Sequence, residues 1–317
     1  MNGMAVGNCK DPESPENHDN SGGDEAAAPR ELCAVAVEVA VEAAGLVALQ
    51  RDFLAQHGSL AQVTTTKSSP VDPVTAVDKA AEARIVERLR ERRPDDAIFG
   101  EEGANIAGES NVTWVIDPID GTVNFLYGQP MYAVSVGAAV GEAFVAGAVV
   151  NVATGDIYRG ATGEGAWVAR GGLRGRGAAA GGSEGCEDEV RLRASHADDP
   201  ATALVATGFS YSARRRQQQA ELLTRVLPRV RDIRRSGSAA LDLCQLAEGR
   251  VDAYYEHGTH PWDYAAAAVI AQEAGAVVRH PGLVDAADDA GLVCAAAPRL
   301  WKSFADLLRC TGVMRGM

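Results

Sequence analysis

Two aspartates three residues apart stand at the end of an apolar segment near the middle of the chain. The segment reads WVIDPIDGTVNF over residues 114–125, with carboxylates at Asp117 and Asp120. Pro118 restrains the backbone between them, and Gly121 permits a tight turn directly afterwards. Mg²⁺ prefers oxygen ligands and commonly takes one or two carboxylates together with substrate phosphate oxygens. The pattern therefore predicts a divalent-cation site, with an Asp-rich turn that merely caps a helix as the alternative.

Further oxygen and amide groups lie within the same motif. The two aspartates could lie between two cations, with the carbonyl oxygen of Ile119 as an additional ligand. The backbone amides of Gly121 and Thr122 begin the next turn and could hold a phosphate group. The motif therefore suits a substrate that carries phosphate.

Acidic residues stand at three other places where a strand ends or a helix begins. Glu101 follows a short apolar segment, Asp78 lies at the expected amino end of a helix, and Asp263 opens an alanine-rich helix. Each one has an ordinary explanation as a solvated turn residue or a helix cap. Their occurrence together with the central motif, in this order, favours one shared cation site.

The spacing of apolar residues predicts a mixed α/β fold that brings these groups together. The expected helices cover residues 31–57, 75–93, 212–227, 238–248, 262–274 and 298–310. The expected strands cover residues 97–99, 112–116, 131–140, 143–151, 155–160, 165–169, 202–206, 230–234, 251–255, 276–280 and 291–296.

The expected domain organisation is a short tail followed by one catalytic domain. Residues 1–30 contain six acidic and two basic residues with almost no large apolar side chains, so we expect a disordered acidic tail. The catalytic domain would cover residues 31–317. It would contain an α+β half over about 31–195, with a flexible Gly/Ala-rich loop over 171–187, and an α/β half over about 196–310.

The overall charge excludes some classes of partner. Among 317 residues, 30 are Lys or Arg and 43 are Asp or Glu, for a net charge of −13. This balance argues against nucleic acid and against anionic membranes, which attract basic surfaces. The start of the chain lacks a signal-peptide pattern, and glutamates interrupt the apolar regions 34–49 and 133–150, so we expect a cytoplasmic protein without a membrane span. The six cysteines show no spacing typical of disulfide frameworks or zinc sites.

The motifs in this order resemble the inositol monophosphatase family, within the superfamily of Mg²⁺-dependent, lithium-sensitive sugar phosphatases. The resemblance covers about residues 31–310. It rests on residues 67–78, 100–102, 114–125, 235–240, 251–256 and 260–263. It implies a layered α-β-α-β-α fold, usually assembled as a homodimer, and an enzyme that binds two to three Mg²⁺ ions.

The same resemblance implies a role for each candidate residue. The implied metal ligands are Glu101, Asp117, the Ile119 carbonyl, Asp120 and Asp263. The implied catalytic residues are Asp78 and Thr122, which match the pair that orients and deprotonates the attacking water, and Glu101, which could also hold a third ion. The implied substrate contacts are Gly121, Thr122, Gly237, Ser238, Ala239, Glu256 and Asp263.

The substrate is the most open part of the sequence-based interpretation. The segments 252–256 and 260–263 are nearest to the inositol branch, so the expected reaction is hydrolysis of myo-inositol 1-phosphate or a related inositol monophosphate. Relatives with the same metal motifs hydrolyse fructose 1,6-bisphosphate, histidinol phosphate or adenosine 3′,5′-bisphosphate. A binding or regulatory protein that keeps only the fold is a further alternative, but the complete set of catalytic and ligand residues argues against it.

Two smaller patterns allow two interpretations each. His257 and His260 could bind a metal or shape the pocket wall, and the preference of Mg²⁺ for oxygen favours the wall. The basic run 214–216 could be a solvated helix face, or it could lie at the rim of the pocket and attract anionic substrates.

Overall fold

The computed structural model describes residues 28–57, 64–66, 73–175, 189–283 and 291–314. Most of the expected tail (1–30) and of the expected loop (171–187) lies outside these ranges. Where they overlap the described residues, helix α1 begins at Pro29 and a short helix α4 covers Gly172–Gly175. The division of one catalytic domain into two halves stays a prediction.

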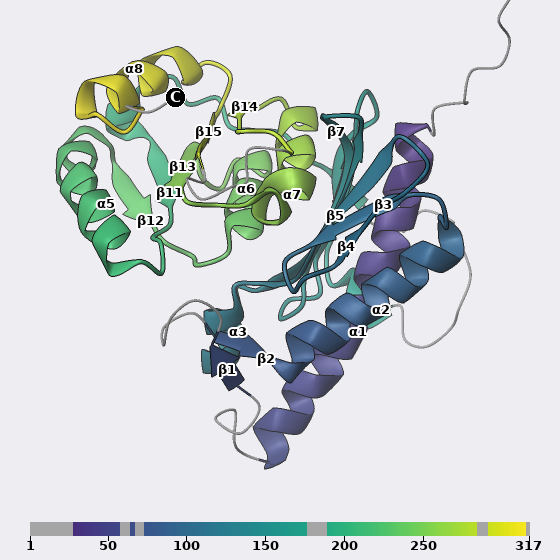
Figure 1. Ribbon diagram of the computed structural model, residues 1–317. Coiled ribbons are helices and arrows are strands. Elements are labelled where there is room, and N and C mark those ends of the chain that lie inside the picture. Colours follow the sequence, from purple (N-terminus) through teal and green to yellow (C-terminus); the bar gives the residue numbers. More distant parts are fainter. Residues whose placement is uncertain (1–27, 58–63, 67–72, 176–188, 284–290, 315–317) are drawn as a thin grey trace, which may run out of the picture.

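An eight-stranded sheet forms the larger layer of the fold (Figure 1). Its strand order is β10-β9-β8-β7-β6-β5-β3-β4, antiparallel throughout except for the parallel pair β3 and β5. The strands are β3 (Ala97–Gly100), β4 (Asn105–Ile106), β5 (Val112–Asp120), β6 (Ala133–Val140), β7 (Ala143–Asn151), β8 (Ile157–Ala161), β9 (Gly165–Ala169) and β10 (Glu189–Arg191). Helices α1 (Pro29–His57) and α2 (Ala76–Arg92) pack on one face, and α7 (Pro261–Glu273) packs on the other.

A five-stranded sheet of order β12-β11-β13-β15-β14 forms the second sheet layer. Its strands are β11 (Leu204–Thr207), β12 (Asp232–Arg234), β13 (Ala253–His257), β14 (Val277–Arg279) and β15 (Leu292–Ala296). Helix α6 (Ala239–Ala247) lies with α7 between the two sheets, while α5 (Ala213–Val226) and α8 (Trp301–Thr311) lie on the outer side (Figure 1). The expected α-β-α-β-α layering is therefore confirmed.

The buried apolar side chains form three clusters that match the spaces between layers. One lies between α1, α2 and the large sheet, a second contains α6 and α7 between the sheets, and a third lies between the small sheet and α8. Because burial of apolar surface is the dominant favourable contribution to folding, these clusters fix the relative positions of the layers.

Helix α1 differs in one respect from the expectation for residues 34–49. By length and composition, Pro29–Gln56 could cross a membrane despite its three glutamates. In the fold, 56% of its most apolar 18-residue window is buried. Val39, Ala43 and Val47 belong to the cluster between α1 and the large sheet, so packing accounts for the apolar character of this helix.

Several short elements were not expected from the sequence. They are β1 (Thr64–Thr66), which pairs with β2 (Pro73–Thr75), together with β4, β10, α4 and α3 (Thr122–Tyr127). The strand expected over 202–206 starts later, at Leu204, because residues 200–202 form a 3₁₀ turn that begins after Asp199. The Asp199 carboxylate accepts a hydrogen bond from the Ala201 amide at 2.9 Å, a typical cap at the start of a helical turn.

Helix α7 approaches the large sheet very closely. A Cβ atom on Gly147 of β7 would lie 2.4 Å from the Cα atom of Ala266, and one on Gly137 of β6 would lie 2.9 Å from the Ala266 amide. Separations this short exclude any side chain at these two positions. The glycines in the sheet and the alanines in the helix therefore let α7 lie very close to the sheet.

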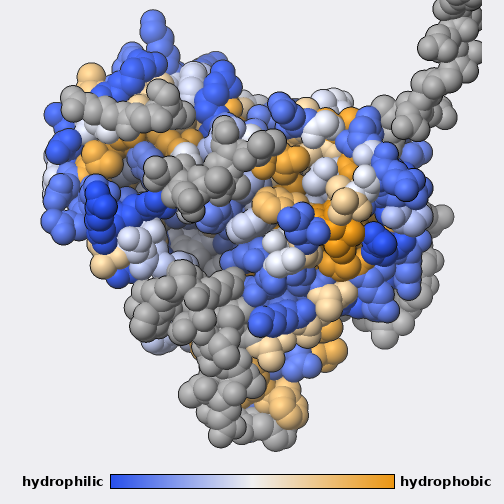
Figure 2. Space-filling model, in the orientation of Figure 1, coloured by the Kyte–Doolittle hydropathy of each residue, from blue (hydrophilic) through white to orange (hydrophobic). Residues whose placement is uncertain are grey.

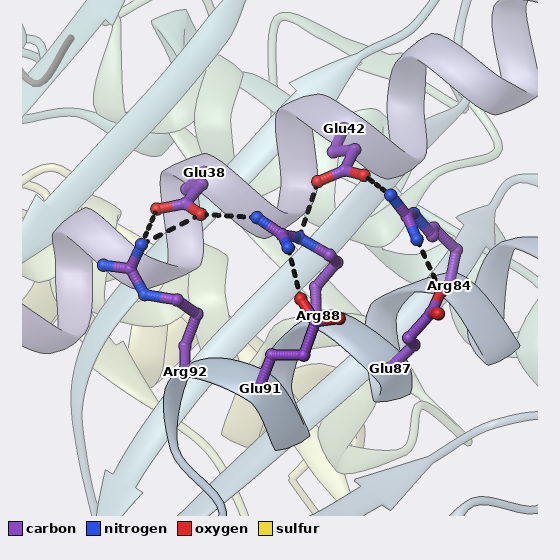
Figure 3. Close-up of polar contacts among 7 residues, drawn as sticks. All are labelled: Glu38, Glu42, Arg84, Glu87, Arg88, Glu91 and Arg92. Atoms are coloured by element: carbon purple, nitrogen blue, oxygen red, sulfur yellow. Dashed lines mark hydrogen bonds and ion pairs between the residues drawn. The ribbon is translucent and has the colours of Figure 1, made fainter. Parts of the chain in front are cut away.

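A row of ion pairs joins helices α1 and α2 on the outer side (Figure 3). Arg88 on α2 lies 3.0 Å from Glu38 and 2.8 Å from Glu42, both on α1. Arg92 also pairs with Glu38, at 2.8 Å, and Arg84 pairs with Glu42.

On the face drawn in Figure 2, hydrophilic residues cover much of the described surface, whereas apolar residues form smaller patches.

Candidate active site

Three aspartates from two distant parts of the chain converge where β5 ends and α7 begins. One carboxylate oxygen each from Asp117, Asp120 and Asp263 lies within 4.8 Å of the others. The pairing of β5 with β6 shifts register between Asp117 and Asp120. Such an irregularity redirects side chains that would otherwise follow the alternation of the strand. The structure therefore brings together the two aspartates of the central motif and the distant Asp263.

The carboxylates of the central motif are also held by hydrogen bonds. Asp117 accepts one from the Ile119 amide at 2.9 Å. Asp120 accepts two at one oxygen, from the Ser238 hydroxyl at 2.6 Å and from the Ala240 amide at 2.8 Å. Since a carboxylate has about four lone-pair sites on its two oxygens, these bonds orient the groups and leave oxygen available for a cation.

Asp263 caps helix α7 and also lies in the cluster of three aspartates. One carboxylate oxygen accepts a hydrogen bond of 2.7 Å from the His260 amide, which makes Asp263 a cap of helix α7. The same side chain belongs to the group of three aspartates. Capping therefore fixes its direction toward the cluster.

Burial and mutual repulsion raise the pKa values of these acids. The pKa of Asp117 is well above its ordinary value, because of burial first and then the charges of Glu101, Asp120 and Asp263. Burial raises the pKa of Asp120 to about 6, although the Ser238 hydroxyl lowers it. The pKa of Asp263 is also raised well above its ordinary value, chiefly by burial and the charge of Asp120. A hard divalent cation would relieve this repulsion, so the donor set fits Mg²⁺.

Glu101 lies on the turn that follows β3, beside the three aspartates. Its charge raises the pKa values of Asp117, Asp120 and Asp263. The turn is anchored by Glu82 of α2, whose carboxylate accepts hydrogen bonds from the Glu102 amide at 2.8 Å and the Ala104 amide at 3.0 Å.

Thr122 and Asp78 form a buried pair next to the cluster. The Thr122 hydroxyl lies 3.3 Å from an Asp78 carboxylate oxygen and 3.1 Å from the Ile119 carbonyl, so its single hydrogen is shared between two acceptors. Asp78 is in the first turn of α2 and is fully buried. The structure thus brings this expected pair together.

The remaining predicted contacts lie on the side of the cluster toward α6 and β13. Ser238 begins α6, and its hydroxyl accepts a hydrogen bond from the Leu241 amide while it donates to Asp120. Its neighbours Gly237 and Ala239 therefore lie beside Asp120. Glu256, on β13, accepts a hydrogen bond from the Tyr254 hydroxyl at 3.0 Å. Burial raises the pKa of Glu256 to about 7, and the Tyr254 hydroxyl opposes this rise.

The histidines take no part in the group of three aspartates. Within the described ranges, the possible metal-binding group contains carboxylates alone. His260 stacks on Trp262 with ring centres 4.9 Å apart, and burial lowers its pKa. The ring of His260 thus packs on Trp262, and its role in a pocket wall stays a prediction. The basic run lies in the first turn of α5, where Arg214 is exposed and Arg215 and Arg216 are half-buried.

Comparison with known proteins identifies the family. The sequence model of the inositol monophosphatase family matches residues 28–310. The chain belongs to the inositol monophosphatase family. Membership makes it an enzyme, a phosphatase, and the fold expected from the resemblance is the fold observed.

Relatives in this family support the assignment. Inositol-1-monophosphatase SuhB of Mycobacterium tuberculosis is 48% identical over 277 residues, which cover 85% of this chain and 90% of that protein. The solved structure of Mycobacterium tuberculosis SuhB has a TM-score of 0.73 and 43% identity, covering 91% of this chain and 99% of its own. A protein of Pasteurella multocida named Nus factor SuhB is 36% identical over 240 residues, covering 75% of this chain and 83% of its own.

Sequence reasoning missed several residues that hold this inositol monophosphatase site in place. Glu82 anchors the turn of Glu101, Asn124 bonds two turns of the site, and Asp242 accepts a hydrogen bond from the Ser236 hydroxyl. The spacing of Glu82 four residues after Asp78 on one helix was an available signal, because such residues share a helix face. Asn124 bonds the Ser236 carbonyl, 112 residues further along the chain, and local patterns do not reveal such a contact. Asp242 bonds a residue only six positions before it.

Proposed function

We propose that the protein is a Mg²⁺-dependent phosphomonoesterase that hydrolyses myo-inositol 1-phosphate, or a related inositol monophosphate, to inositol and phosphate. The observation that carries this proposal is the convergence of Asp117, Asp120 and Asp263 within 4.8 Å, beside the buried pair Thr122 and Asp78. A cluster of carboxylates repels a phosphate dianion unless cations are bound, so the geometry suits a metal-dependent phosphatase.

The proposed metal ligands are all oxygen donors. They are Glu101, Asp117, the Ile119 carbonyl, Asp120 and Asp263, and together they would hold two to three Mg²⁺ ions. When bound, Mg²⁺ would offset the charge of the phosphate and stabilise the attacking and leaving oxygens of an in-line displacement.

The Thr122–Asp78 pair supplies the proton transfer in this proposal. The Thr122 hydroxyl would orient the attacking water and accept its proton, while the hydroxyl proton moves to the Asp78 carboxylate 3.3 Å away. General-base catalysis requires such a hydrogen-bonded chain before the pKa values matter. Burial of Asp78 excludes bulk water from the acceptor.

The substrate would lie with its phosphate at the Gly121 and Thr122 amides and its ring toward the start of α6. Gly237, Ser238 and Ala239 would contact ring hydroxyls, and Glu256 would hydrogen-bond another. With a pKa of about 7, the Glu256 carboxyl exists in both forms near neutral pH and can accept or donate.

A substrate panel tests this proposal. The enzyme is assayed with Mg²⁺ against inositol 1-phosphate, fructose 1,6-bisphosphate, histidinol phosphate and adenosine 3′,5′-bisphosphate, with and without Li⁺. We expect the highest kcat/KM for inositol 1-phosphate, inhibition by Li⁺, and no turnover in EDTA. The Asp117→Asn variant should fold normally, as measured by circular dichroism, and lose Mg²⁺-dependent turnover. Wild-type turnover in that variant would overturn the metal assignment.

We also propose a cytoplasmic homodimer that binds neither nucleic acid nor membranes. The net charge of −13 supports the second part. The name Nus factor belongs to the Pasteurella multocida relative, and it makes an RNA-binding assay the appropriate check. Light scattering would measure the assembly state.

A further inference from the structure

The side chain of Asn124 connects two turns of the site that lie far apart in the sequence. Asn124 is 8% exposed and lies in the first turn of α3. Its side-chain nitrogen donates one hydrogen bond to the Met131 carbonyl at 2.6 Å and another to the Ser236 carbonyl at 2.8 Å. Because both partners can only accept, the amide nitrogen and not its oxygen must face them.

The two connected turns are so close together that neither Gly121 nor Gly237 has room for a side chain. A Cβ atom on Gly121 would lie 2.8 Å from the Met131 carbonyl oxygen and 3.1 Å from that of Gly237. One on Gly237 would lie 2.8 Å from the Asn124 amide nitrogen. Both glycines have a φ of +92°, which other residues rarely adopt. The turn after Asp120 and the turn before α6 therefore pack directly against each other, and the Asn124 side chain contacts the second of them.

A second attachment lies closer to the carboxylate cluster. Asp120 accepts hydrogen bonds from the Ser238 hydroxyl and the Ala240 amide. Residues 236–240 are thus attached to the central motif at two points, Asp120 and Asn124. In the proposed function, the alcohol portion of a phosphate ester bound at the cluster would lie toward residues 236–240.

We propose that Asn124 is a positioning residue whose side-chain amide fixes the separation between the Gly121–Thr122 turn and the Ser236–Ser238 turn. The fixed separation lets one substrate molecule contact both turns, through its phosphate and through its ring hydroxyls. This inference rests on the proposed phosphatase function and concerns the choice among phosphate esters. Its prediction is therefore a loss that depends on the alcohol portion of the substrate.

The Asn124→Asp variant tests this inference. The substitution keeps the side-chain shape but places an oxygen against two carbonyl oxygens, so both hydrogen bonds are lost and the turns separate. We expect kcat/KM for inositol 1-phosphate to fall about 10–100-fold, mainly through a higher KM. This is the range observed when residues that orient the direct binding groups are replaced. For p-nitrophenyl phosphate, which lacks ring hydroxyls, the fall should be less than about threefold.

Asn151→Asp is the matched control. Asn151 is also buried, and its side-chain nitrogen donates to the Pro130 carbonyl at 3.2 Å, next to Met131. Its side-chain oxygen accepts from the amides of Ala153 and Thr154 and so holds the end of β7. This variant disturbs the loop near Met131 without removing the bond to Ser236, and we expect kcat/KM for both esters to stay within about threefold of wild type.

A second variant covers the case in which Asn124→Asp does not fold. Asn124→Ala removes the donors without adding a charge, and circular dichroism with thermal melting establishes whether each variant is folded. An equal loss on both esters in the folded Asn124 variant, or the same pattern in Asn151→Asp, would overturn the inference. Absence of wild-type activity toward both esters would instead contradict the proposed function, and with it the inference.

Discussion

Carboxylates at two places in this fold have opposite surroundings. Between α1 and α2, Glu38 and Glu42 each pair with arginines of the neighbouring helix (Figure 3). At the end of β5, Asp117 and Asp120 are surrounded by other acids, and burial raises their pKa values. Side chains of the same chemistry therefore stabilise one contact and strain the other.

The difference concerns where the compensating charge comes from. The helix pair carries its own cations on side chains that are partly exposed, where ion pairs contribute little to stability. Asp117 and Asp120 of the cluster are buried, where uncompensated charge costs far more, so their carboxylates are either protonated or balanced by a cation from solution. A fold that retains such a cost at one place marks that place as functional.

The largest expected effect is on turnover. Asp263→Asn removes one of the proposed charged oxygen ligands and should lower kcat/KM for inositol 1-phosphate by more than about 100-fold, because losses from indirect partners of a metal site already reach that size. Glu42→Gln makes the same chemical change between the helices and should leave kcat/KM within about twofold of wild type. Steady-state assays with saturating Mg²⁺ measure both. Comparable losses in the two variants would remove the distinction between the regions.

The next effect is on stability without metal. Asp117→Asn removes a repelled buried charge and should raise the Tm in EDTA by a few degrees, which corresponds to about 1 kcal/mol in a chain of this size. Glu38→Gln should lower the Tm slightly, because Arg88 and Arg92 each lose their ion pair with Glu38. Thermal melting at pH 7.5 in EDTA measures the change in Tm of each variant. A lower Tm for Asp117→Asn would show that the cluster is not strained.

A further effect is a pH dependence of stability that Mg²⁺ should weaken. The folded-state pKa values of Asp120 and Glu256, about 6 and about 7, lie above their ordinary values of 3.8 and 4.5. A raised pKa favours the fold while the group is protonated, so the contribution of these two groups to stability in EDTA is full below about pH 4 and is lost as the pH rises through 6 and 7. Melting curves from pH 5 to 8, with and without Mg²⁺, should show the steeper fall in EDTA. Identical slopes would argue against a cation at the cluster.

The sequence predicted this site only as far as local patterns and family resemblance extend. Asp117 and Asp120 could be recognised because they lie three residues apart, and the helices because their apolar residues repeat with the helical period. Asp263, more than 140 residues later in the chain, could be joined to them only by resemblance. Glu82 and Asn124 bind backbone groups of other segments, and such contacts arise only after folding.

Secondary structure followed the same division. The long elements α1, β6 and β7 were expected, whereas β4 and β10 are too short to show a period. Their pairing with β3 and β9 defines them instead.

The close packing of α7 on the large sheet also determines the spacing of the three aspartates. Asp263 stands at the start of α7, while Asp117 and Asp120 belong to the sheet, so the separation of the ligands follows the height of the helix above the sheet. That height depends on the absence of a side chain at Gly147. A single added methyl group, deep in the interior, would thus alter the spacing of the three carboxylates and with it the size of cation they could hold.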